Sequence, residues 1–446
     1  MMKKTYIYTA ILTAVLAAAL TGCGNAVISN SASVNTAQSV SSAEESTEQS
    51  AAPETEHAVI VEAASVTQLS NPVNTDDVFT ERDLAQTADT DGAEIITVSD
   101  GQTISITNEG VYIIRGTATE CTIRIEADDS AKVQLVLDGV SITNSDFPAI
   151  YAVSADKVFI TTTDSENTLT VSGQFRADGD TNTDAVIFSK DDLVLNGTGT
   201  LNVTSDYGNG ITCKDDLKIT GGTYNVCCAL DAFEANDSIS VNDGTFTVKS
   251  EKDGFHCEND NAEGTITVYG GTFEIQGGSD GMQACALLEI NSGTMNITGA
   301  EGLEATYIRI NDGTISIQAS DDGINASTGT SAYETAVEIN GGYLTIAVGQ
   351  GDTDAIDANG SIYVNGGTID ITAQMSSFDY DRTAEFNGGT IIINGTEVTE
   401  IPQSMMGGGG MFGGRGRMNG GMPDDTEDGM SSGMFGGHGR MKGTPA

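Results

Sequence analysis

The chain has 446 residues and a formal net charge of −45, because it contains 64 acidic residues against 19 basic ones. Such a charge repels nucleic acid and anionic lipid headgroups, which excludes both as direct partners. The 54 glycines, the 6 prolines and the absence of tryptophan indicate many tight turns and remove the commonest flat stacking surface for sugars.

Residues 1–23 have the pattern of an export signal. Lys3 and Lys4 precede an apolar run, residues 6–20, that is too short for a comfortable membrane span. The run ends in LTGC (20–23), which resembles the lipobox of bacterial lipoproteins. This resemblance implies cleavage before Cys23 and a lipid on its sulfur. We therefore expect a mature chain held by lipid on the extracellular side of the cell membrane.

Two low-complexity segments flank the central part of the chain. Residues 24–75 are rich in Ser, Thr, Ala and Glu, which predicts a disordered tether. Residues 403–446 are rich in Gly and Met and contain the near-duplicates MFGGRGRM (411–418) and MFGGHGRM (434–441), so we expect a disordered tail. This tail fits either a flexible end without a partner or a clasp for the acidic domain or the cell wall.

Between these segments, residues 76–402 repeat a unit of two short strands joined by a glycine turn. Examples are LKITGGTYNV (217–226), IRINDGTISI (308–317) and IYVNGGTIDI (362–371). The nine turn glycines from Gly199 to Gly389 span 190 residues in eight steps, or about 24 residues per repeat. Steps of this size are typical of a solenoid, whereas an antiparallel sandwich, the alternative for short alternating strands, does not need a fixed step.

The repeat predicts an all-β, parallel β-helix with three strands in each triangular coil. Apolar residues alternate within each half of the unit, so each half is a strand with one buried face. Stacked coils place equivalent residues about 4.8 Å apart, in ladders along the axis. We expect an asparagine ladder at one corner, from Asn196 through Asn242 and Asn291 to Asn387. We also expect an interior column that begins with Tyr224, Phe246 and Phe273.

An acidic five-residue motif opens the third strand of each repeat, as in DGMQA (280–284) and EGLEA (301–305). In-register coils bring the first acids within one strand spacing, where like charges repel unless a cation neutralises them. Ca²⁺ takes six to eight oxygen ligands, so we expect Ca²⁺ between coils at this corner. The alternative is that Asp-Gly simply makes a good bend, with the carboxylates in water. The expected ligands are Asp231, Glu234, Asp253, Asp280, Glu301, Glu304, Asp322, Asp354 and Asp357.

Lys190 and Lys214 occupy the same place in two successive repeats, which read SKDDL and CKDDL. An exposed lysine beside Ca²⁺ is the arrangement that a polysaccharide lyase needs, because the metal acidifies the proton α to a uronate carboxyl and the amine removes it. A surface ion-pair cluster explains the two lysines equally well. The six cysteines that follow Cys23 include no CxxC pair, and we expect them to be buried free thiols.

Two long runs carry a specific resemblance to a known family. They are VYIIRGTATECTIRIEADDSAKVQLVLDGVSITNSDFPAIYAVSADKVFI (111–160) and TDAVIFSKDDLVLNGTGTLNVTSDYGNGITCKDDLKITGGTY (183–224). Both resemble the β-helical carbohydrate-binding family of clostridial surface proteins, over roughly residues 76–400. The resemblance implies a right-handed parallel β-helix with calcium sites, similar in architecture to pectate lyases, that binds cellulose and polygalacturonate. Asn209 departs from the acidic motif, as does DYD (379–381), so metal binding does not follow at those coils.

We therefore expect a monomeric surface lipoprotein that binds polysaccharide and touches the membrane only through the lipid on Cys23. The net charge opposes direct binding of a uronate polymer, so uronate binding requires bridging Ca²⁺. Two other functions stay open, a calcium-dependent polysaccharide lyase and a non-catalytic envelope adhesin or spacer. Candidate sugar-contacting residues are Tyr207, Tyr269, Tyr307, Tyr363 and Tyr380.

Overall fold

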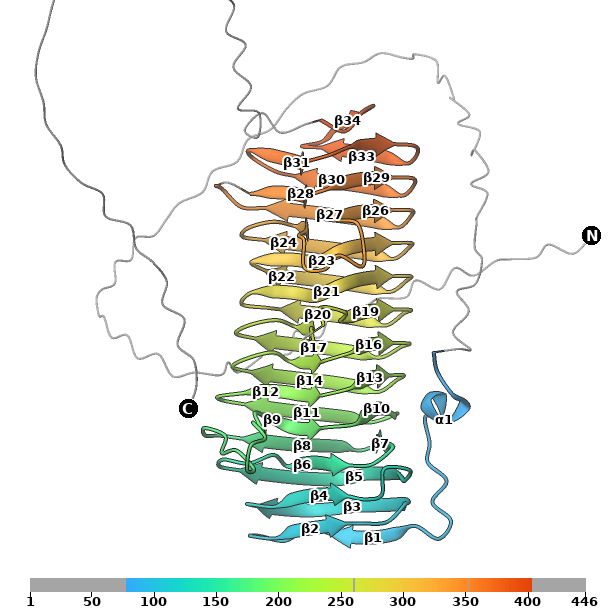
Figure 1. Ribbon diagram of the computed structural model, residues 1–446, viewed down its shortest axis with the longest axis vertical. Helices are drawn as coiled ribbons and strands as arrows, with labels where there is room; N and C mark the ends of the chain where they lie inside the picture. Colours follow the sequence, from blue (N-terminus) through green and yellow to red (C-terminus); the bar gives the residue numbers. More distant parts are fainter. Residues whose placement is uncertain (1–77, 260, 352, 403–446) are drawn as a thin grey trace, which may run out of the picture. The chain divides into compact units, whose positions relative to one another are not determined.

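The structure, a computed structural model, describes residues 78–259, 261–351 and 353–402. These residues form a parallel β-solenoid of about 12 turns, about 24 residues apart, with almost no helix (Figure 1). The fold class and the repeat length expected from the sequence are therefore confirmed. The expected signal segment (1–23), tether (24–75) and tail (403–446) lie outside the described residues.

A full coil contributes one strand to each of three parallel sheets, and each strand pairs with its counterpart one coil later. Four long strands bend through a corner and so belong to two sheets. Sheet 1 contains β1 (Glu94–Thr97), β3 (Gly110–Thr119), β5 (Lys132–Asn144), β7 (Lys157–Thr162), β10 (Asp192–Gly197), β13 (Asp216–Ile219), β16 (Ser238–Val241), β19 (Thr265–Val268), β21 (Asp280–Ile290), β23 (Glu301–Ile310), β26 (Ala336–Ile339), β29 (Ser361–Val364) and β32 (Ala384–Phe386).

Sheets 2 and 3 complete each coil. Sheet 2 contains the second halves of β3 and β5, then β8 (Glu166–Val171), β11 (Thr200–Ser205), β14 (Thr223–Cys228), β17 (Thr245–Ser250), β20 (Thr272–Gln276), β22 (Thr294–Gly299), β24 (Thr314–Ala319), β27 (Tyr343–Val348), β30 (Thr368–Thr372) and β33 (Thr390–Ile393). Sheet 3 contains β2 (Thr103–Ile106), β4 (Thr122–Glu126), β6 (Ile150–Ser154), β9 (Ala185–Ser189), β12 (Asn209–Cys213), β15 (Phe233–Ala235), β18 (Phe255–Cys257), the first halves of β21 and β23, β25 (Ile324–Ala326), β28 (Asp354–Ala358) and β31 (Ser376–Tyr380). The last strand, β34 (Thr396–Val398), pairs antiparallel with β33.

The interior is filled by alternate side chains of all three sheets, so the expected interior column is confirmed. Phe246 is paired in register with Tyr224 on one side and Phe273 on the other. Its ring stacks on both neighbours, with ring centroids 5.4 Å from Tyr224 and 4.6 Å from Phe273. Phe233 and Phe255 of sheet 3 stack on each other at 4.6 Å and meet Phe246 edge-on. These contacts tie two sheets together across the middle of the solenoid.

The asparagine ladder is confirmed from Asn291 to Asn387, in the upper part of the solenoid, by which we mean its C-terminal coils (Figure 1). Side-chain amides donate from Asn311 to Asn291, Asn340 to Asn311, Asn365 to Asn340 and Asn387 to Asn365, at 2.8, 2.9, 2.8 and 2.9 Å. Below Asn291, the backbone pairing places Tyr269 at the ladder position of the next coil, which interrupts the row of amides. Asn196, at the lower end, donates its amide to the carbonyl of Asp83 instead.

Residues 78–86, which we call the strap, cross the outward face of the lower part of sheet 1 (Figure 1). The strap contains the only helix of the described residues, α1 (Glu81–Leu84), which begins with a capping box at Thr80. Asp83 is fully buried, and its carbonyl accepts a hydrogen bond from Thr220. The strap covers the outward side chain of Phe159, because Arg82 lies 4.5 Å over its ring.

The prediction of buried free thiols holds for four of its six positions, because Cys285 is free but only half-buried. Free thiols are found at Cys121, Cys213, Cys228, Cys257 and Cys285, of which the first four are buried. Cys227 is disulfide-bonded, so the expectation is wrong there. Its half-buried side chain points away from the interior. No helix in the part of the chain that the structure describes has the length and apolarity needed to cross a bilayer.

Candidate functional site

The first acids of the motifs form a single column, the acid column, at the start of the sheet 3 strands. The backbone N–H of Asp253 donates to Oδ1 of Asp231 at 3.0 Å, and that of Asp280 donates to Oδ1 of Asp253 at 3.0 Å. The same bond joins Asp354 to Asp322 at 2.7 Å. One oxygen of these aspartates therefore satisfies the backbone of the next coil, which gives the acid a structural role independent of any ion.

Asn209 begins the column and shows what this structural role requires. Its Oδ1 accepts the backbone N–H of Asp231 at 2.9 Å, as an aspartate does one coil later. A neutral amide therefore caps the next coil as well as a carboxylate does. Capping of the next coil therefore does not by itself require the negative charge of the later members.

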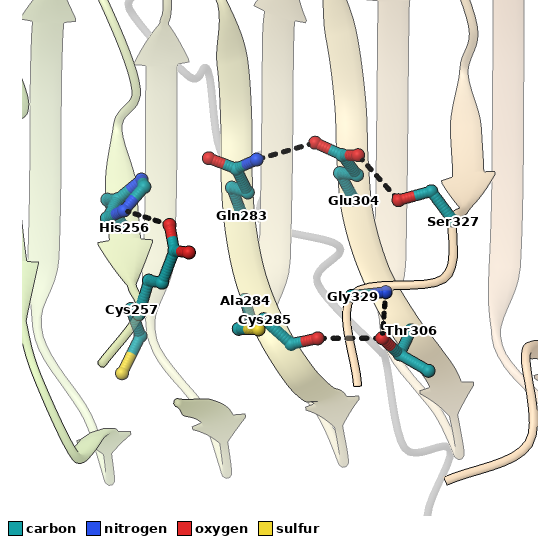
Figure 2. Close-up of a pocket in the computed structure, with 10 residues that line it drawn as sticks. His256, Cys257, Gln283, Ala284, Cys285, Glu304, Thr306, Ser327 and Gly329 are labelled. Atoms are coloured by element: carbon teal, nitrogen blue, oxygen red, sulfur yellow. Dashed lines mark hydrogen bonds and ion pairs between the residues drawn. The ribbon is translucent and has the colours of Figure 1, made fainter. Parts of the chain in front are cut away.

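A second row of polar side chains runs beside the acid column on the outward face of sheet 3. In-register pairing places Glu234, His256, Gln283, Glu304, Asn325 and Asp357 on successive coils. Figure 2 shows the middle of this row, where Gln283 donates to Glu304 at 2.7 Å and Ser327 donates to Glu304 at 2.8 Å. A pocket of about 110 Å³ lies between these side chains and those of Cys257, Cys285 and Thr306.

Protein cations neutralise the lower end of the acid column. Lys252 Nζ lies 3.4 Å from Asp231 Oδ2, and His256 Nδ1 lies 2.8 Å from Asp253 Oδ2. Burial alone would raise the pKa of Asp253, but the hydrogen bonds from His256 and the backbone of Asp280 outweigh it and lower that pKa. This end of the column therefore has its own counter-charges and little need for a metal ion.

The middle of the column has no such counter-charge. Oxygens of Asp280, Glu301 and Glu304 all lie within 4.8 Å of one another, and Asp280 is only 5% exposed. Burial, followed by the nearby carboxylates, raises the pKa of Asp280 to about 7 and that of Glu301 to about 8. Among the described residues, no lysine, arginine or histidine forms an ion pair with these three acids. Neutral side chains donate to two of these acids, Asn325 to Glu301 and Gln283 to Glu304. Three converging carboxylates without an ion-pair partner among the described residues are a ligand set that suits a hard cation.

The remaining expected ligands fall into two other groups. Asp322, Asp354 and Asp357 lie on the coils above, where burial and then the charges of Asp322 and Asp354 raise the pKa of Asp357 to about 7. Glu234 belongs to the lower end, where it accepts hydrogen bonds from Asn209 and Thr212 and pairs with Lys214 at 2.9 Å. The nine expected ligands are thus divided between the acid column and the second row beside it, and they do not converge on one point.

A separate acidic cluster lies outside the acid column, where sheet 3 turns into sheet 1. We did not assign it as a metal site from the sequence. Oxygens of Asp192, Asp215 and Asp216 lie within 4.8 Å of one another. Lys157 Nζ is 3.5 Å from Asp192, and Ser238 donates to Asp216 at 2.6 Å. Two of the three acids therefore already have partners within the protein. The sequence signal for this cluster was the repeated KDDL motif, which contains all three aspartates.

We expect the contribution of His256 to the free energy of unfolding to depend on pH. The hydrogen bond and charge of Asp253, with the charges of Asp231 and Glu234, overcome burial and raise the pKa of His256. Glu258 also faces the ring at 3.7 Å. A raised folded-state pKa means that the contribution is complete below the unfolded value of about 6.5 and is lost as the pH rises through the folded value.

We therefore expect His256→Gln to destabilise the protein by about 1–3 kcal/mol at about pH 5, the usual size for a hydrogen bond to a charged group, and by much less at about pH 9. Urea unfolding of the wild type and the variant in chelator, across this range, measures the difference. Gln is the natural choice because Gln283 occupies the same position one coil later. A difference that stays constant with pH would show that His256 does not act as a charged partner.

The two candidate catalytic lysines lie on adjacent coils, as expected, but away from the middle of the acid column. Backbone pairing of Ser189 with Cys213 places Lys190 beside Lys214. Lys214 pairs with Glu234 and lies on a coil three coils below that of Asp280, or about 14 Å at the usual strand spacing. A lyase needs a lysine amine next to its cation, and these two lysines do not meet that requirement at the Asp280 cluster.

The five candidate tyrosines do not form one platform. Tyr207, which is 54% exposed, lies in the turn between β11 and β12, whereas Tyr269 packs edge-on against Phe79 of the strap at 5.6 Å. Tyr307 donates to Glu338 at 2.8 Å, and Tyr363 is half-buried on the same outward face of sheet 1. Tyr380 packs against the core at the end of sheet 3.

An exposed tyrosine that we did not select lies on sheet 2. Tyr343 is 48% exposed and is paired in register between Thr314 and Thr368 on the outward face. The sequence contained a signal for it, because VEINGGYLTI (337–346) has Tyr where the other units have Thr directly after the turn glycine.

Comparison with known proteins gives three findings. A family model described as carbohydrate-binding domain-containing protein matches residues 100–355 and 301–413. A protein of Acetivibrio thermocellus with the same description is 35% identical over 139 residues, which are 30% of this chain and 48% of that protein. The chain thus spans about half the length of this curated relative.

The third finding is a solved structure described as a polysaccharide lyase-like protein from C. thermocellum, in a gadolinium derivative. It covers 68% of this chain and 97% of its own, with 24% identity and a TM-score of 0.32, a likeness too weak to carry an argument. The family model, in contrast, matches far more than half of the chain. The protein therefore belongs to the family of carbohydrate-binding domain-containing proteins.

Proposed function

We propose that the protein is a cell-surface lipoprotein that binds polysaccharide through a calcium-stabilised β-solenoid. Family membership over residues 100–413 is the observation that carries carbohydrate binding. The lipobox pattern that ends at Cys23 supports the lipid anchor and the extracellular location. The ligands in this proposal are cellulose and uronate-containing wall or plant glycans.

The architecture suits a polymeric ligand because both are periodic. A regular row such as the asparagine ladder presents the same group once per coil, about 4.8 Å apart. A polysaccharide presents the same sugar again and again along its length. Contacts that are weak at each coil add up when several successive sugars engage at once, because the later contacts are intramolecular.

Calcium is proposed at the middle of the acid column, where Asp280, Glu301 and Glu304 would hold it. Their oxygens lie within 4.8 Å of one another, and no described ion pair compensates them. Bound there, Ca²⁺ would supply positive charge to carboxylates that otherwise repel one another across neighbouring coils. Its role in this proposal is to stabilise the stack, and the neighbouring group that contains Asp357 is a second place for an ion.

Binding is tested by co-sedimentation of the full chain with insoluble cellulose and with immobilised polygalacturonate, each in Ca²⁺ and in chelator. We expect retention on the neutral glucan in both conditions. Retention on the uronate polymer should fall about tenfold or more in chelator, because a chain of charge −45 repels a polyanion without a bridging cation.

Loss of retention on both polymers in both conditions would remove polysaccharide binding from the proposal. Retention on wall fragments that free sugars do not compete for would instead support an adhesin or spacer. An absorbing unsaturated product released from the uronate polymer would revive the lyase, with Lys190→Ala and Lys214→Ala as its controls.

A further inference from the structure

Sheet 2 carries a row of threonines on its outward face, one per coil, directly after the turn glycines. We call it the threonine row. In-register pairing links all its members in order, with Tyr343 replacing threonine at one coil. The threonine row comprises Thr200, Thr223, Thr245, Thr272, Thr294, Thr314, Tyr343, Thr368 and Thr390.

The hydroxyls of the threonine row are not used by the protein itself. Thr245, Thr272, Thr294 and Thr314 are exposed, and Tyr343 is 48% exposed. Across the described ranges, no side-chain hydroxyl of the row donates or accepts a hydrogen bond within the chain. Each hydroxyl is both a donor and an acceptor, so the row offers a regular array of free hydrogen-bonding groups.

The other two faces differ, because their polar groups have partners or their surface is covered. The strap crosses the lower part of sheet 1. On its upper part, Arg309 is held between Glu289 at 3.2 Å and Glu338 at 2.8 Å. Sheet 3 carries the acid column and its hydrogen-bonded second row. Sheet 2 is therefore the face whose regular polar groups remain available to a ligand.

The charge of the row selects the class of ligand. From Thr200 to Thr390 the threonine row contains no charged side chain, although the whole chain carries −45. Lys249, Glu274 and Asp370 lie beside the row on the same face, but a polymer that follows the row itself meets no fixed charge within it. A polyanion, in contrast, is repelled by the molecule as a whole. The exposed ring of Tyr343 adds a stacking surface for the apolar face of a sugar.

The spacing of the row indicates how a glycan chain would be oriented relative to the solenoid axis. Successive hydroxyls lie one strand spacing apart, about 4.8 Å. A pyranose unit in an extended 1,4-linked chain has nearly this length. A glycan laid along the solenoid axis therefore meets an equivalent hydroxyl at each sugar, whereas a glycan laid parallel to the strands leaves the row after one contact.

We infer that the threonine row is the docking surface for an extended, uncharged, 1,4-linked glycan that lies along the solenoid axis. This inference rests on the proposed function and adds to it the face, the class of polymer and the direction. Calcium and sugar then use different sheets, because the acid column belongs to sheet 3 and the threonine row to sheet 2.

The test is Thr272→Arg in the full chain, measured by binding isotherms on insoluble cellulose. Thr272 lies in the middle of the row, and a long charged side chain there holds a flat ligand away or has to be desolvated beneath it. Tyr343→Ala is a second variant, which removes the stacking ring without adding bulk. Thr103→Arg is the matched control, because Thr103 is an exposed strand threonine on sheet 3.

We expect Thr272→Arg to weaken binding at least tenfold and Tyr343→Ala to weaken it severalfold, with Thr103→Arg unchanged. Circular dichroism and the melting temperature confirm that each variant is folded. Wild-type binding that both sheet 2 variants retain would overturn this inference and leave the proposed function standing. Absence of wild-type binding to any polysaccharide would remove the proposed function, and this inference with it.

Discussion

Glu301→Gln is expected to abolish the rise in melting temperature that Ca²⁺ gives to the wild-type protein. Glu301 lies within 4.8 Å of Asp280 and Glu304, so replacing its carboxylate removes a charged ligand from the proposed site. A ligand at one hundred times its Kd stabilises a folded protein by about 2.7 kcal/mol, which corresponds to a shift of several degrees. Calorimetric scans in Ca²⁺ and in chelator measure the shift directly.

The same variant should behave differently in chelator. The folded-state pKa of Glu301, raised to about 8 by burial and then by Glu304, means that ionising this group opposes folding. This cost is absent below the unfolded value of about 4.3 and grows as the pH rises toward the folded value. At about pH 8 without Ca²⁺, Glu301→Gln should therefore be at least as stable as the wild type.

The control is Glu274→Gln, the same change at an exposed strand position on sheet 2. It should leave the Ca²⁺ shift as it is in the wild type. Asp280→Asn offers a second removal of charge, and Asn209 shows that an amide preserves the capping of the next coil. An equal Ca²⁺ shift in the wild type, Glu301→Gln and Asp280→Asn would mean that the ion binds elsewhere or not at all.

Phe246→Ala is expected to destabilise the solenoid by about 3–5 kcal/mol, the usual cost of emptying a buried aromatic site. Its ring stacks between Tyr224 and Phe273 and meets two further rings of sheet 3 edge-on. The neighbouring rings are fixed by strands on three successive coils, so they cannot easily collapse into the space. Both the apolar burial and the ring contacts are lost together.

Urea unfolding followed by circular dichroism measures this loss, and hydrogen exchange locates it. Solenoids unfold in local segments, so protection should fall most in the coils of β14, β17 and β20. Thr247→Ala, the outward neighbour on β17, is the control and should change stability by less than about 0.5 kcal/mol. A loss below about 1 kcal/mol for Phe246→Ala would contradict the packing described for this column.

The sequence was sufficient to predict the coil, its register and its interior because these follow from one spacing. Once Gly222, Gly244 and Gly271 are aligned as turn glycines, the residues that follow them fall into rows without further information. The register found between Tyr224, Phe246 and Phe273 is a consequence of that alignment. Rows of identical function, such as the asparagine ladder, are predictable for the same reason.

The strap was not predictable in this way because it has no period. Its position depends on contacts between Phe79 and Tyr269 and between Gln86 and Thr220, which are 190 and 134 residues apart in the chain. Nothing in the sequence marks such pairs. The strap therefore affects the prediction of sugar-contacting residues. Tyr269, which the sequence suggested for that role, packs against Phe79 of the strap.

The acid column was predictable as a column, but its division into neutralised and uncompensated parts was not. Which acids are neutralised depends on how far Lys252 and His256 reach between coils. The periodicity assigned Asp253 and Asp280 to the same role, although the pKa of Asp253 is lowered and that of Asp280 is raised to about 7. Side-chain reach, not spacing, separates them.

The most direct test of the separation between the calcium face and the sugar face is a crossed measurement on Glu301→Gln and Thr272→Arg. Each variant is assayed both for its Ca²⁺-dependent melting shift and for its isotherm on insoluble cellulose. We predict that Glu301→Gln loses the shift and keeps cellulose binding, whereas Thr272→Arg keeps the shift and loses cellulose binding. Loss of both properties in either folded variant, or loss of cellulose binding in Glu301→Gln alone, would contradict two separate faces.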